Sequence, residues 1–285
     1  MDAEDQSGQT GRQGDGGGGR LMKSLDRLGI DRREAKTASE MLTILLARRK
    51  ADRAGPPDPA NPTLSDFFAY ALPRVARAQG QLFQDLWVLF ELGDLQPGYF
   101  VDFGATNGVT MSNSHLLEKH HGWQGILAEP NPEYHERLGR ERGARISHKC
   151  VYSRSGLTMD FLCTQQGTFS RLADIAPGDR HETEKRMNPR TIAVETITLE
   201  DLLQEHGAPE TIDYLSVDTE GSELEILQAF DFSRRFVRCL TVEHNYTPMR
   251  EALHELLTAQ GYVRRFPEFS RFDDWYVHRE ARTAG

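Results

Sequence analysis

The stretch FVDFGATNG, from Phe100 to Gly108, places an apolar run directly before an acid and two closely spaced glycines. Phe100 and Val101 are typical of a buried strand. A strand does not account for the carboxylate of Asp102, nor for backbone that lacks side chains at Gly104 and Gly108. Because glycine lets another group approach the backbone closely, we expect a strand to end here beside a ligand.

Outward from this stretch, strand and helix patterns alternate in the way that is typical of a parallel sheet with crossover helices. The expected strands cover residues 99–104, 124–129, 145–152, 212–218, 237–243 and 274–278, with an added strand at 157–163. The expected helices cover residues 110–121, 132 onward, 199–206, 223–230 and 248 to near 261. Asn131 before Pro132, and Thr198, are typical N-caps. The polar segment from Gln165 to Arg190 is expected to be a loop, of a length usual for lids and binding segments.

The N-terminal third differs in composition from the rest of the chain. Residues 1–20 are rich in glycine and contain no large apolar anchor, so we expect a disordered tail. Residues 21–95 are expected to form a helical extension, which the prolines of AGPPDPANP (54–62) interrupt. An apolar stripe at 41–46 is expected to pack on the chain's own core, although it could also bind a partner or a membrane surface. The N-terminal helices could also join two copies in a homo-oligomer. Residues 96–280 are expected to form the main domain.

Charge and composition exclude several classes of function. The net charge of -9 disfavours nucleic acid and anionic membranes as partners, because both attract positive surfaces. The three cysteines are widely spaced and suggest neither a disulfide framework nor a zinc site. No apolar run approaches the roughly 20 residues of a transmembrane helix, and the N-terminus is acidic. We therefore expect a cytoplasmic protein without a transmembrane segment.

Acidic residues end four of the expected strands. Three strands end in or near Asp102, Glu129 and Asp218, and a fourth ends in Glu243 and His244. In open α/β sheets, ligands bind outside the carboxyl ends of the strands, so these side chains are expected at one binding edge. The segment GATNG lacks the spacing of a dinucleotide loop, and no phosphate-binding GK[ST] is present. A ribose held by Glu129 without a pyrophosphate, beside an acidic edge, suits the cationic S-adenosylmethionine.

Several motifs together resemble the FkbM family of S-adenosylmethionine-dependent methyltransferases. They are QDLWVLFELG, GYFVDFGATNGVTMSNSHLLEKHHGWQGILAEPNP, VETITLEDLL, IDYLSVDTEGSELEIL, TVEHNYTPMRE and FDDWYV, within residues 81–278. The resemblance implies a class I Rossmann-like methyltransferase fold, with a mostly parallel seven-stranded sheet and helices on both faces. It also implies methyl transfer, commonly to hydroxyls of sugars or of glycosylated and polyketide natural products. The family often has Asn in the glycine loop where this chain has Thr106.

The resemblance also implies positions for the cofactor. The loop around its methionine part would contain Asp102, Gly104, Thr106, Asn107 and Gly108. Glu129, followed by Pro130, would hold the ribose, and Val151 to Ser153 would flank the adenine. The motifs DTEGSE (218–223) and EHN (243–245) would face the reacting methyl group.

The identity of the catalytic base stays open at this point. A hydroxyl acceptor ionises far above neutral pH, so a positioned base is needed. His244 beside Glu243 is the first candidate, because an ordinary histidine is mostly neutral at pH 7 and can accept a proton. Asp218 is the rival base. Alternatively, Asp218, Glu220 and Glu243 could bind Mg²⁺ or another divalent cation that acidifies the hydroxyl. Glu223 is expected only to interact favourably with a helix N-terminus.

The favoured function is therefore an S-adenosylmethionine-dependent O-methyltransferase that acts on a small molecule or glycan, with a sugar hydroxyl as the expected acceptor. A methyltransferase-like module that binds a partner without catalysis is the alternative. An oxidoreductase with a nicotinamide cofactor is disfavoured by the missing phosphate loop. The co-occurrence of Asp102, Gly104, Glu129, Asp218 and His244 favours the enzyme, because a silent module has no chemical need for all of them.

Overall fold

The structure is a computed structural model, and it describes residues 62–164, 170–174 and 189–281. All of these residues belong to one compact unit that spans residues 57–285. The predicted tail at 1–20 and the apolar stripe at 41–46 lie outside the described residues. The predicted boundary between a helical extension and a main domain at residues 95 and 96 stays a prediction.

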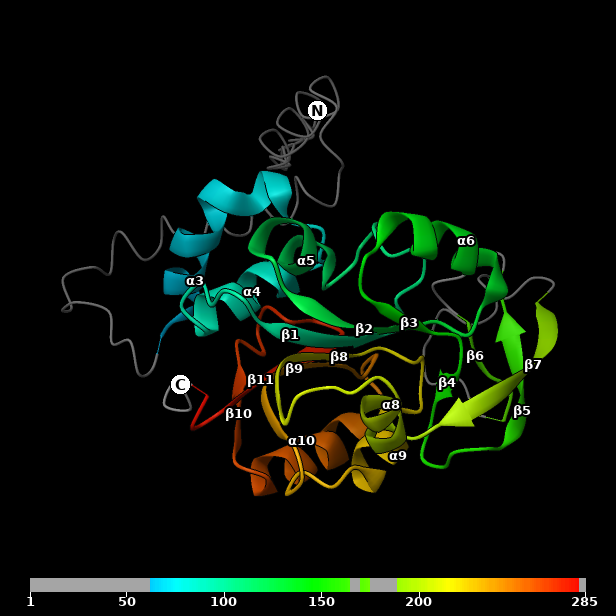
Figure 1. Cartoon of the computed structure of the whole chain (residues 1–285). Coiled ribbons are helices and arrows are strands. Elements are labelled where there is room, and N and C mark those ends of the chain that lie inside the picture. Colours follow the sequence, from blue (N-terminus) through cyan, green and yellow to red (C-terminus); the bar gives the residue numbers. More distant parts are fainter. Residues whose placement is uncertain (1–61, 165–169, 175–188, 282–285) are drawn as a thin grey trace, which may run out of the picture. The chain divides into compact units, whose positions relative to one another are not determined.

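A mixed seven-stranded sheet forms the centre of this unit (Figure 1). Its strands are β1 (Tyr99–Phe103), β2 (Gln124–Ala128), β3 (Arg145–Ser147), β8 (Thr211–Val217), β9 (Phe236–Glu243), β10 (Tyr262–Arg265) and β11 (Asp273–His278). They follow the order β10-β11-β9-β8-β1-β2-β3. The five strands from β9 to β3 pair in parallel, whereas β11 runs antiparallel to both of its neighbours. The expectation of seven strands is confirmed, and the parallel arrangement holds only for part of the sheet.

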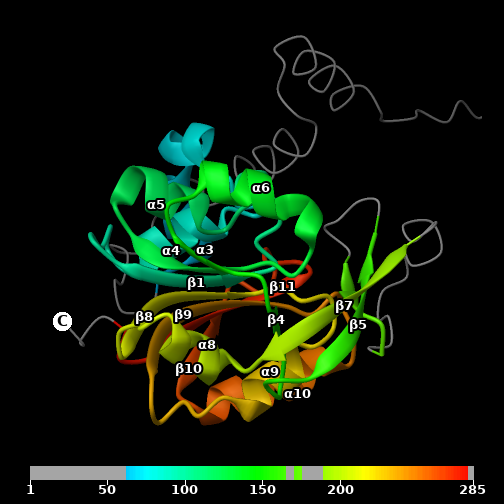
Figure 2. The ribbon, with the colours of Figure 1, turned by 45° about the vertical axis from the view of Figure 1, so that its right-hand side comes forward.

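Helices cover both faces of the sheet, as expected. They are α3 (Leu64–Ala71), the 3₁₀ helix η1 (Leu72–Arg77), α4 (Gln84–Glu91), α5 (His115–His121), α6 (Pro132–Glu141), α8 (Leu199–Glu205), α9 (Glu223–Ala229) and α10 (Met249–Ala259). Figures 1 and 2 show α4, α5 and α6 on one face and α8, α9 and α10 on the other. The predicted caps are confirmed, because Asn131 accepts the N–H of Glu133 and Thr198 accepts the N–H of Asp201.

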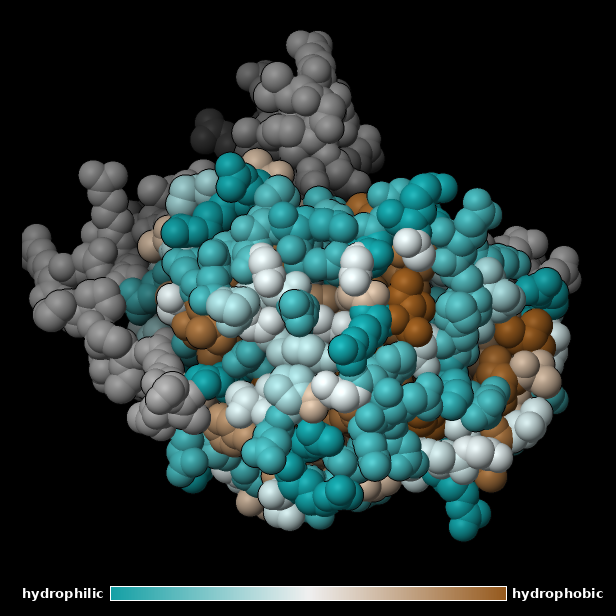
Figure 3. All heavy atoms as spheres, in the orientation of Figure 1, coloured by the Kyte–Doolittle hydropathy of each residue, from teal (hydrophilic) through white to brown (hydrophobic). Residues whose placement is uncertain are grey.

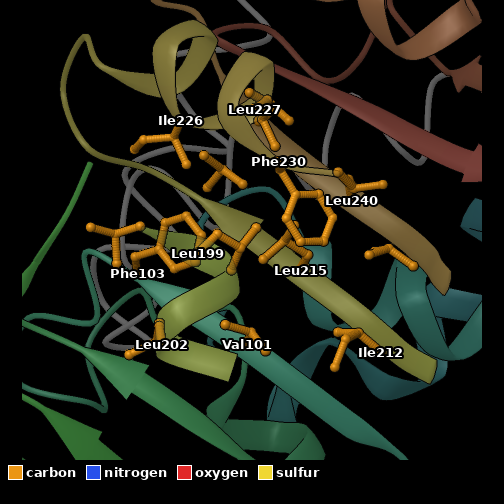
Figure 4. Packing of buried hydrophobic residues seen from close by; sticks show 14 of the residues in the cluster. Val101, Phe103, Leu199, Leu202, Ile212, Leu215, Ile226, Leu227, Phe230 and Leu240 are labelled. Carbon is orange, nitrogen blue, oxygen red and sulfur yellow. The ribbon is translucent and has the colours of Figure 1, made fainter. Parts of the chain in front are cut away.

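A large hydrophobic core lies between the sheet and the helices α8, α9 and α10. Val101 and Phe103 of β1 point into it and pack with residues of β8, β9, α8 and α9, among them Leu199, Leu215 and Ile226 (Figure 4). Successive side chains of a strand point to opposite faces. The alternation therefore directs Asp102, which lies between Val101 and Phe103, to the face that α5 covers.

The N-terminal helices α3 and α4 pack on the antiparallel edge of the sheet through aromatic rings. Phe67 of α3 contacts Trp275 of β11 edge to face, with ring centroids 5.8 Å apart, and Phe68 contacts Phe269 at 4.9 Å. The ring centroids of Trp87 in α4 and Trp275 are 5.2 Å apart. Such rings contribute both buried area and specific pair geometry. These contacts fix α4, whose first residue reaches the candidate site described below.

A second, four-stranded sheet lies beside the main one (Figure 2). It contains β4 (Cys150–Val151), β7 (Arg190–Ile197), β5 (Thr158–Cys163) and β6 (Arg171–Leu172), in that order. The expectation of a single strand at 145–152 is wrong, because β3 ends at Ser147 and β4 pairs with β7 in the second sheet. The strands β6, β7 and β10 were not predicted. Residues 165–169 and 175–188 of the predicted loop lie outside the described residues.

The expected helix at 110–121 begins only at His115. Side chains satisfy the backbone before it: Asn107 Oδ1 accepts the N–H groups of Val109 and Thr110, and Ser112 Oγ accepts the N–H of His115. Short polar side chains of this kind compete with helical hydrogen bonds. Residues 105–114 consequently form a turn-rich loop over the end of β1.

The described helices and the surface in Figure 3 bear on whether the chain could span or bind a membrane. In the described part of the chain, no helix is long and apolar enough to cross a membrane. The face seen in Figure 3 is mostly hydrophilic, and its apolar side chains are gathered in small separate groups. Isolated apolar groups of this size are ordinary on a protein surface.

Candidate active site

Five positions at the carboxyl edge of the sheet lie in one row. Phe103 pairs with Ala128 and with Val217, Val217 pairs with Val242, and Glu243 pairs with Asp273. One residue further along, the row across the strands reads Glu129, Gly104, Asp218, Glu243 and Asp273. Neighbouring strands are about 4.8 Å apart, so side chains at adjacent positions of such a row interact. The prediction that acids at the strand ends share one edge is confirmed for Glu129, Asp218 and Glu243, whereas Asp102 lies inside β1.

Asp102 is buried below this edge and connects three elements. Its Oδ2 accepts a hydrogen bond from Ser114 Oγ at 2.6 Å, and Ser216 of β8 also bonds its side chain. Burial raises the pKa of Asp102, while these hydroxyls and the guanidinium of Arg142 act in the opposite direction. Ser216 in turn accepts a hydrogen bond from Asn113 Nδ2 at 3.0 Å.

The two glycines of the loop are explained first by contacts within the protein. A Cβ atom at Gly104 would lie 2.1 Å from the carbonyl oxygen of Asp218, and one at Gly108 would lie 2.5 Å from Leu138 Cδ1. Both glycines also have positive φ, at 79° and 75°, which disfavours any other residue. Tight packing of the loop against Asp218 and Leu138 therefore requires glycine at both positions even without a ligand. Their role in cofactor binding stays a prediction.

Thr106 and Asn107 shape the same loop. Thr106 has φ of 46°, a left-handed conformation that is strained for a β-branched residue and easier for Asn. Its N–H donates to Glu129 Oε2 at 2.8 Å, which fixes the strained residue against β2. Asn107 Oδ1 is occupied by the two backbone N–H groups named above. The loop therefore has a defined shape before any ligand is considered.

Glu129 joins the loop to the start of α6. Its two oxygens accept the N–H groups of Thr106 and Asn131, at 2.8 and 2.7 Å. Burial raises the pKa of Glu129 to about 7, despite these two hydrogen bonds. Each carboxylate oxygen can accept a second hydrogen bond, so the predicted contact to ribose hydroxyls is compatible with this geometry. Pro130, which follows, is partly buried.

The two residues predicted to flank the adenine lie at the junction between the two sheets. Val151 is buried in the main core, where its cluster also contains Ala128 and Ile197. Ser153 is partly exposed and bonds the side chain of Tyr152, which also contacts Glu225 of α9. Their contact with adenine stays a prediction.

Asp218, Glu220 and Glu243 bring three carboxyl groups together. One oxygen from each can be chosen so that all three lie within 4.8 Å of one another. The pKa of Asp218 is well above its ordinary value because of burial, with further increases from Glu220, Asp273 and Glu223. A hydrogen bond with Glu243 acts against these effects, and burial raises the pKa of Glu243 as well. Glu243 Oε2 is buried and has no hydrogen-bond partner among the described residues.

The two neighbouring acids have partners within the protein. Glu223 Oε1 accepts the N–H groups of Thr219 and Gly221, at 2.9 and 3.0 Å, as expected for an acid at the start of a helix. Asp273 Oδ2 accepts a hydrogen bond from Gln84 Nε2 at 2.7 Å. Burial raises the pKa of Asp273 to about 7. The first residue of α4 is thus part of the acidic edge.

His244 is buried on the side of Asp274. Its Nδ1 accepts the N–H of Tyr246 at 3.0 Å, and its Nε2 lies 3.7 Å from Asp274 Oδ1. Asp274 binds Arg250 through two hydrogen bonds of 2.8 and 2.9 Å. Burial lowers the pKa of His244, and the Asp274 carboxylate acts in the opposite direction. The ring is therefore neutral at pH 7, with its Nδ1 lone pair already occupied.

A small pocket opens between the glycine loop and the acidic edge. Its lining residues come from β1, β8 and the loop between β1 and α5, and they are Asp102, Gly104, Ala105, Thr106, Met111, Ser112, Asn113, Ser216 and Asp218. Asn113 Oδ1 is buried without a hydrogen-bond partner among the described residues. The lining thus combines two carboxyl groups with an unused acceptor, which favours a ligand that carries a cation and N–H donors.

Several residues of this site were not predicted from the sequence. Ser114, Asn113 and Arg142 support Asp102, and Gln84 and Asp273 extend the acidic edge. The dipeptide DD within the motif FDDWYV places an acid at the start of a strand next to β9, which is the one signal that could have indicated Asp273. Nothing local marks Arg142 or Gln84, because their partners are distant in sequence.

Comparison with known proteins identifies the family. Residues 102–271 match the model of the methyltransferase FkbM domain, which is more than half of the chain. The matched range contains the glycine loop, Glu129 and the acidic residues of β8 and β9. The search of curated proteins gave no match. The match and the arrangement of the site agree with the sequence resemblance, and the chain belongs to the FkbM methyltransferase family.

Proposed function

We propose that the protein is an S-adenosylmethionine-dependent O-methyltransferase that modifies a hydroxyl group of a sugar, free or within a larger molecule. Membership of a methyltransferase family supports methyl transfer. The observation that carries the finer proposal is the row at the carboxyl edge of four adjacent parallel strands. Glu129, Gly104 and Asp218 directly follow three of them, and Glu243 is the last residue of the fourth. This row provides a ribose acceptor at one end and candidate bases at the other.

The residues around the pocket fit S-adenosylmethionine. Its sulfonium and ammonium groups are cationic, and Asp102, Asp218 and the unpartnered Asn113 Oδ1 provide acceptors for them. Glu129 would accept hydrogen bonds from the ribose hydroxyls, while its bonds to Thr106 and Asn131 hold it in place. When bound, the cofactor supplies an electrophilic methyl carbon. The glycine loop, held from below by Asp102 and Arg142, would orient it.

Asp218 is the base that the described contacts support best. It is partly exposed at the pocket, whereas His244 is buried and already accepts a backbone hydrogen bond through Nδ1. The raised pKa of Asp218 brings this carboxylate closer to the basicity needed at neutral pH. Glu243 hydrogen-bonds Asp218 and would orient it. Asp218 would then take the proton of the acceptor hydroxyl as the methyl group is transferred.

A divalent cation is a second candidate for activating the hydroxyl. Asp218, Glu220 and Glu243 offer oxygen ligands of the type that Mg²⁺ binds, within 4.8 Å of one another. The buried Glu243 Oε2, which has no hydrogen-bond partner in the described part of the chain, is the observation that favours this role. The cation would lower the pKa of a bound hydroxyl and relieve the repulsion among the three acids.

A methyl-transfer assay tests this proposal. The wild-type protein is incubated with S-adenosylmethionine, labelled in its methyl group, and with a panel of methyl pyranosides. We expect transfer to at least one sugar, and Asp218→Asn should lower turnover by roughly 10²–10⁴. Asp160→Asn, at an exposed position of β5, is the matched control and should be fully active. Binding of S-adenosylmethionine without transfer to any sugar would favour the non-catalytic binding module or another acceptor class.

A further inference from the structure

Tyr246 is the most exposed large hydrophobic residue of the described chain. Its side chain is 66% exposed, although it lies only three residues beyond the buried Glu243. Single exposed apolar residues are common and need no explanation. The conformation of this residue and its neighbours, however, distinguishes Tyr246 from an ordinary surface position.

Two consecutive residues of this turn have left-handed backbone. Asn245 and Tyr246 have φ of 47° and 58°. For a residue with a Cβ atom this conformation is unfavourable, and a bulky side chain makes it unusual. A surface turn without a further role would more readily contain glycine here. Strain of this kind is typical of binding and catalytic sites, where it presents a side chain in a fixed direction.

Hydrogen bonds hold the strained turn rigidly. The N–H groups of His244 and Asn245 both donate to the carbonyl of Phe272, at 2.8 and 3.1 Å, and Thr247 donates to the carbonyl of His244. The N–H of Tyr246 donates to His244 Nδ1, and the two rings meet edge to face with centroids 5.6 Å apart. The buried imidazole therefore fixes both the backbone and the ring of Tyr246.

The turn also faces the acidic residues. Asn245 Nδ2 lies 3.5 Å from Glu220 Oε2, and Glu220 itself has a left-handed φ of 60°. Glu220 belongs to the trio with Asp218 and Glu243. The residue that precedes Tyr246 thus contacts one member of this trio.

We infer that Tyr246 is a specificity-determining residue that stacks on the apolar face of the acceptor sugar, and that His244 is its positioning residue. A pyranose ring has a C–H face that gains from burial against an aromatic ring, while its hydroxyls suit carboxylate acceptors. Tyr246 provides the exposed ring, and Asn245 connects its turn to the carboxylate of Glu220. This inference rests on the proposed transfer to a sugar, and it replaces the base role of His244 by a structural contact with Tyr246.

Binding of the same methyl pyranosides to the full-length protein tests the inference, by saturation-transfer NMR in the presence of S-adenosylhomocysteine. We expect Tyr246→Ala to weaken sugar binding at least fivefold and Tyr246→Phe to retain most of it, because the ring remains. Leu72→Ala, which alters another exposed apolar residue, should bind like the wild type. In the transfer assay, His244→Ala should raise KM for the sugar severalfold and leave kcat within about threefold of the wild type.

Calorimetric titration of the same variants with S-adenosylmethionine separates the role of Tyr246 in sugar binding from the proposed methyltransferase function. Unchanged cofactor affinity together with weakened sugar binding supports the role of Tyr246. Sugar affinity of Tyr246→Ala within twofold of the wild type would overturn the inference while leaving methyl transfer intact. A wild-type protein that binds the cofactor but no pyranoside would also overturn it. A large loss of kcat at unchanged KM in His244→Ala would restore histidine as the base.

Discussion

Arg142 reaches Asp102 through a single hydroxyl group. Its Nη2 lies 3.0 Å from Ser114 Oγ, and this hydroxyl donates to Asp102 at 2.6 Å. The same guanidinium bonds the carbonyl of Gly108 at 3.0 Å and Glu118 at 2.7 Å, and its side chain is fully buried. One cation thus supports both the acid below the pocket and the far end of the glycine loop.

Replacement of Arg142 should therefore destabilise the fold. Arg142→Ala removes a buried guanidinium together with its bonds to Glu118 and to the carbonyl of Gly108, so the free energy of unfolding should fall by about 3–5 kcal/mol. Urea denaturation measures the change. Arg140→Ala, two residues earlier in the last turn of α6, is the control: its pair with Glu141 is exposed, and the substitution should cost less than about 1 kcal/mol. Equal effects of the two variants would contradict the supporting role of Arg142.

Thr106→Asn should stabilise the protein. The left-handed φ of 46° is strained for threonine and better tolerated by asparagine, so the free energy of unfolding should rise by about 1 kcal/mol. The N–H that bonds Glu129 is retained in this variant. Thr110→Asn, at an exposed position of the same loop, should give no such gain. Thermal unfolding compares the two, and a lower midpoint for Thr106→Asn would exclude strain at this residue.

Stability should fall as the pH rises towards neutrality. Glu129 and Asp273 have pKa values of about 7 in the folded protein, above their ordinary values of 4.5 and 3.8, because they are buried. Between these limits the folded state binds more protons than the unfolded state, so increasing pH favours unfolding. At about 1.4 kcal/mol per pKa unit, Glu129 alone contributes about 3 kcal/mol to this fall.

Urea titrations at pH 5 and pH 7.5, with chelator present, measure this dependence. Asp273→Asn should reduce the fall, because the amide oxygen can still accept the hydrogen bond from Gln84 while one buried acid is removed. An unfolding free energy that increases over the same pH range would contradict the raised pKa values.

Magnesium or manganese should stabilise the protein most at the higher pH. The trio Asp218, Glu220 and Glu243 must lose its protons to bind a cation, so the rise in Tm should be larger at pH 7.5 than at pH 5. A cation at 100 times its Kd adds about 2.7 kcal/mol to the free energy of unfolding. Glu220→Gln should weaken the effect, whereas Glu255→Gln, on the exposed face of α10, should not. If neither the cation nor a chelator changes the Tm and the activity, the proposal that these three residues bind a cation is wrong.

The sequence predicts the part of the fold that local patterns determine. The strands before Gly104, Glu129 and Asp218, and the caps Asn131 and Thr198, follow from apolar runs and capping residues, and all are found. The strand β10 has only four residues, too few for a clear period. The late start of α5 depends on side-chain bonds from Asn107 and Ser112, which compete with a helix-like pattern.

In the candidate site, too, the sequence predicts the features that depend on local patterns and misses those that depend on tertiary packing. The acids at the strand ends share an edge because parallel strands end together, which sequence reasoning can anticipate. Arg142 supports Asp102 although the two residues are 40 positions apart in the sequence. Gln84 and Asp273, which share a hydrogen bond, are 189 positions apart. The burial of His244 against Asp274 likewise depends on tertiary packing. For this reason the sequence left the base undecided between His244 and Asp218.

Calorimetric titration of the full-length protein with S-adenosylmethionine tests the central claim most directly. We predict binding of one cofactor per chain, and a loss of roughly 1–3 kcal/mol in Glu129→Ala, the usual cost of removing a charged hydrogen-bond partner. Circular dichroism of this variant shows whether it folds without the contacts of Glu129 to the loop. Glu133→Ala, at an exposed position of α6, is the control and should bind the cofactor like the wild type. A wild-type protein that gives no binding heat at any temperature and no cofactor-dependent rise in Tm would contradict the account.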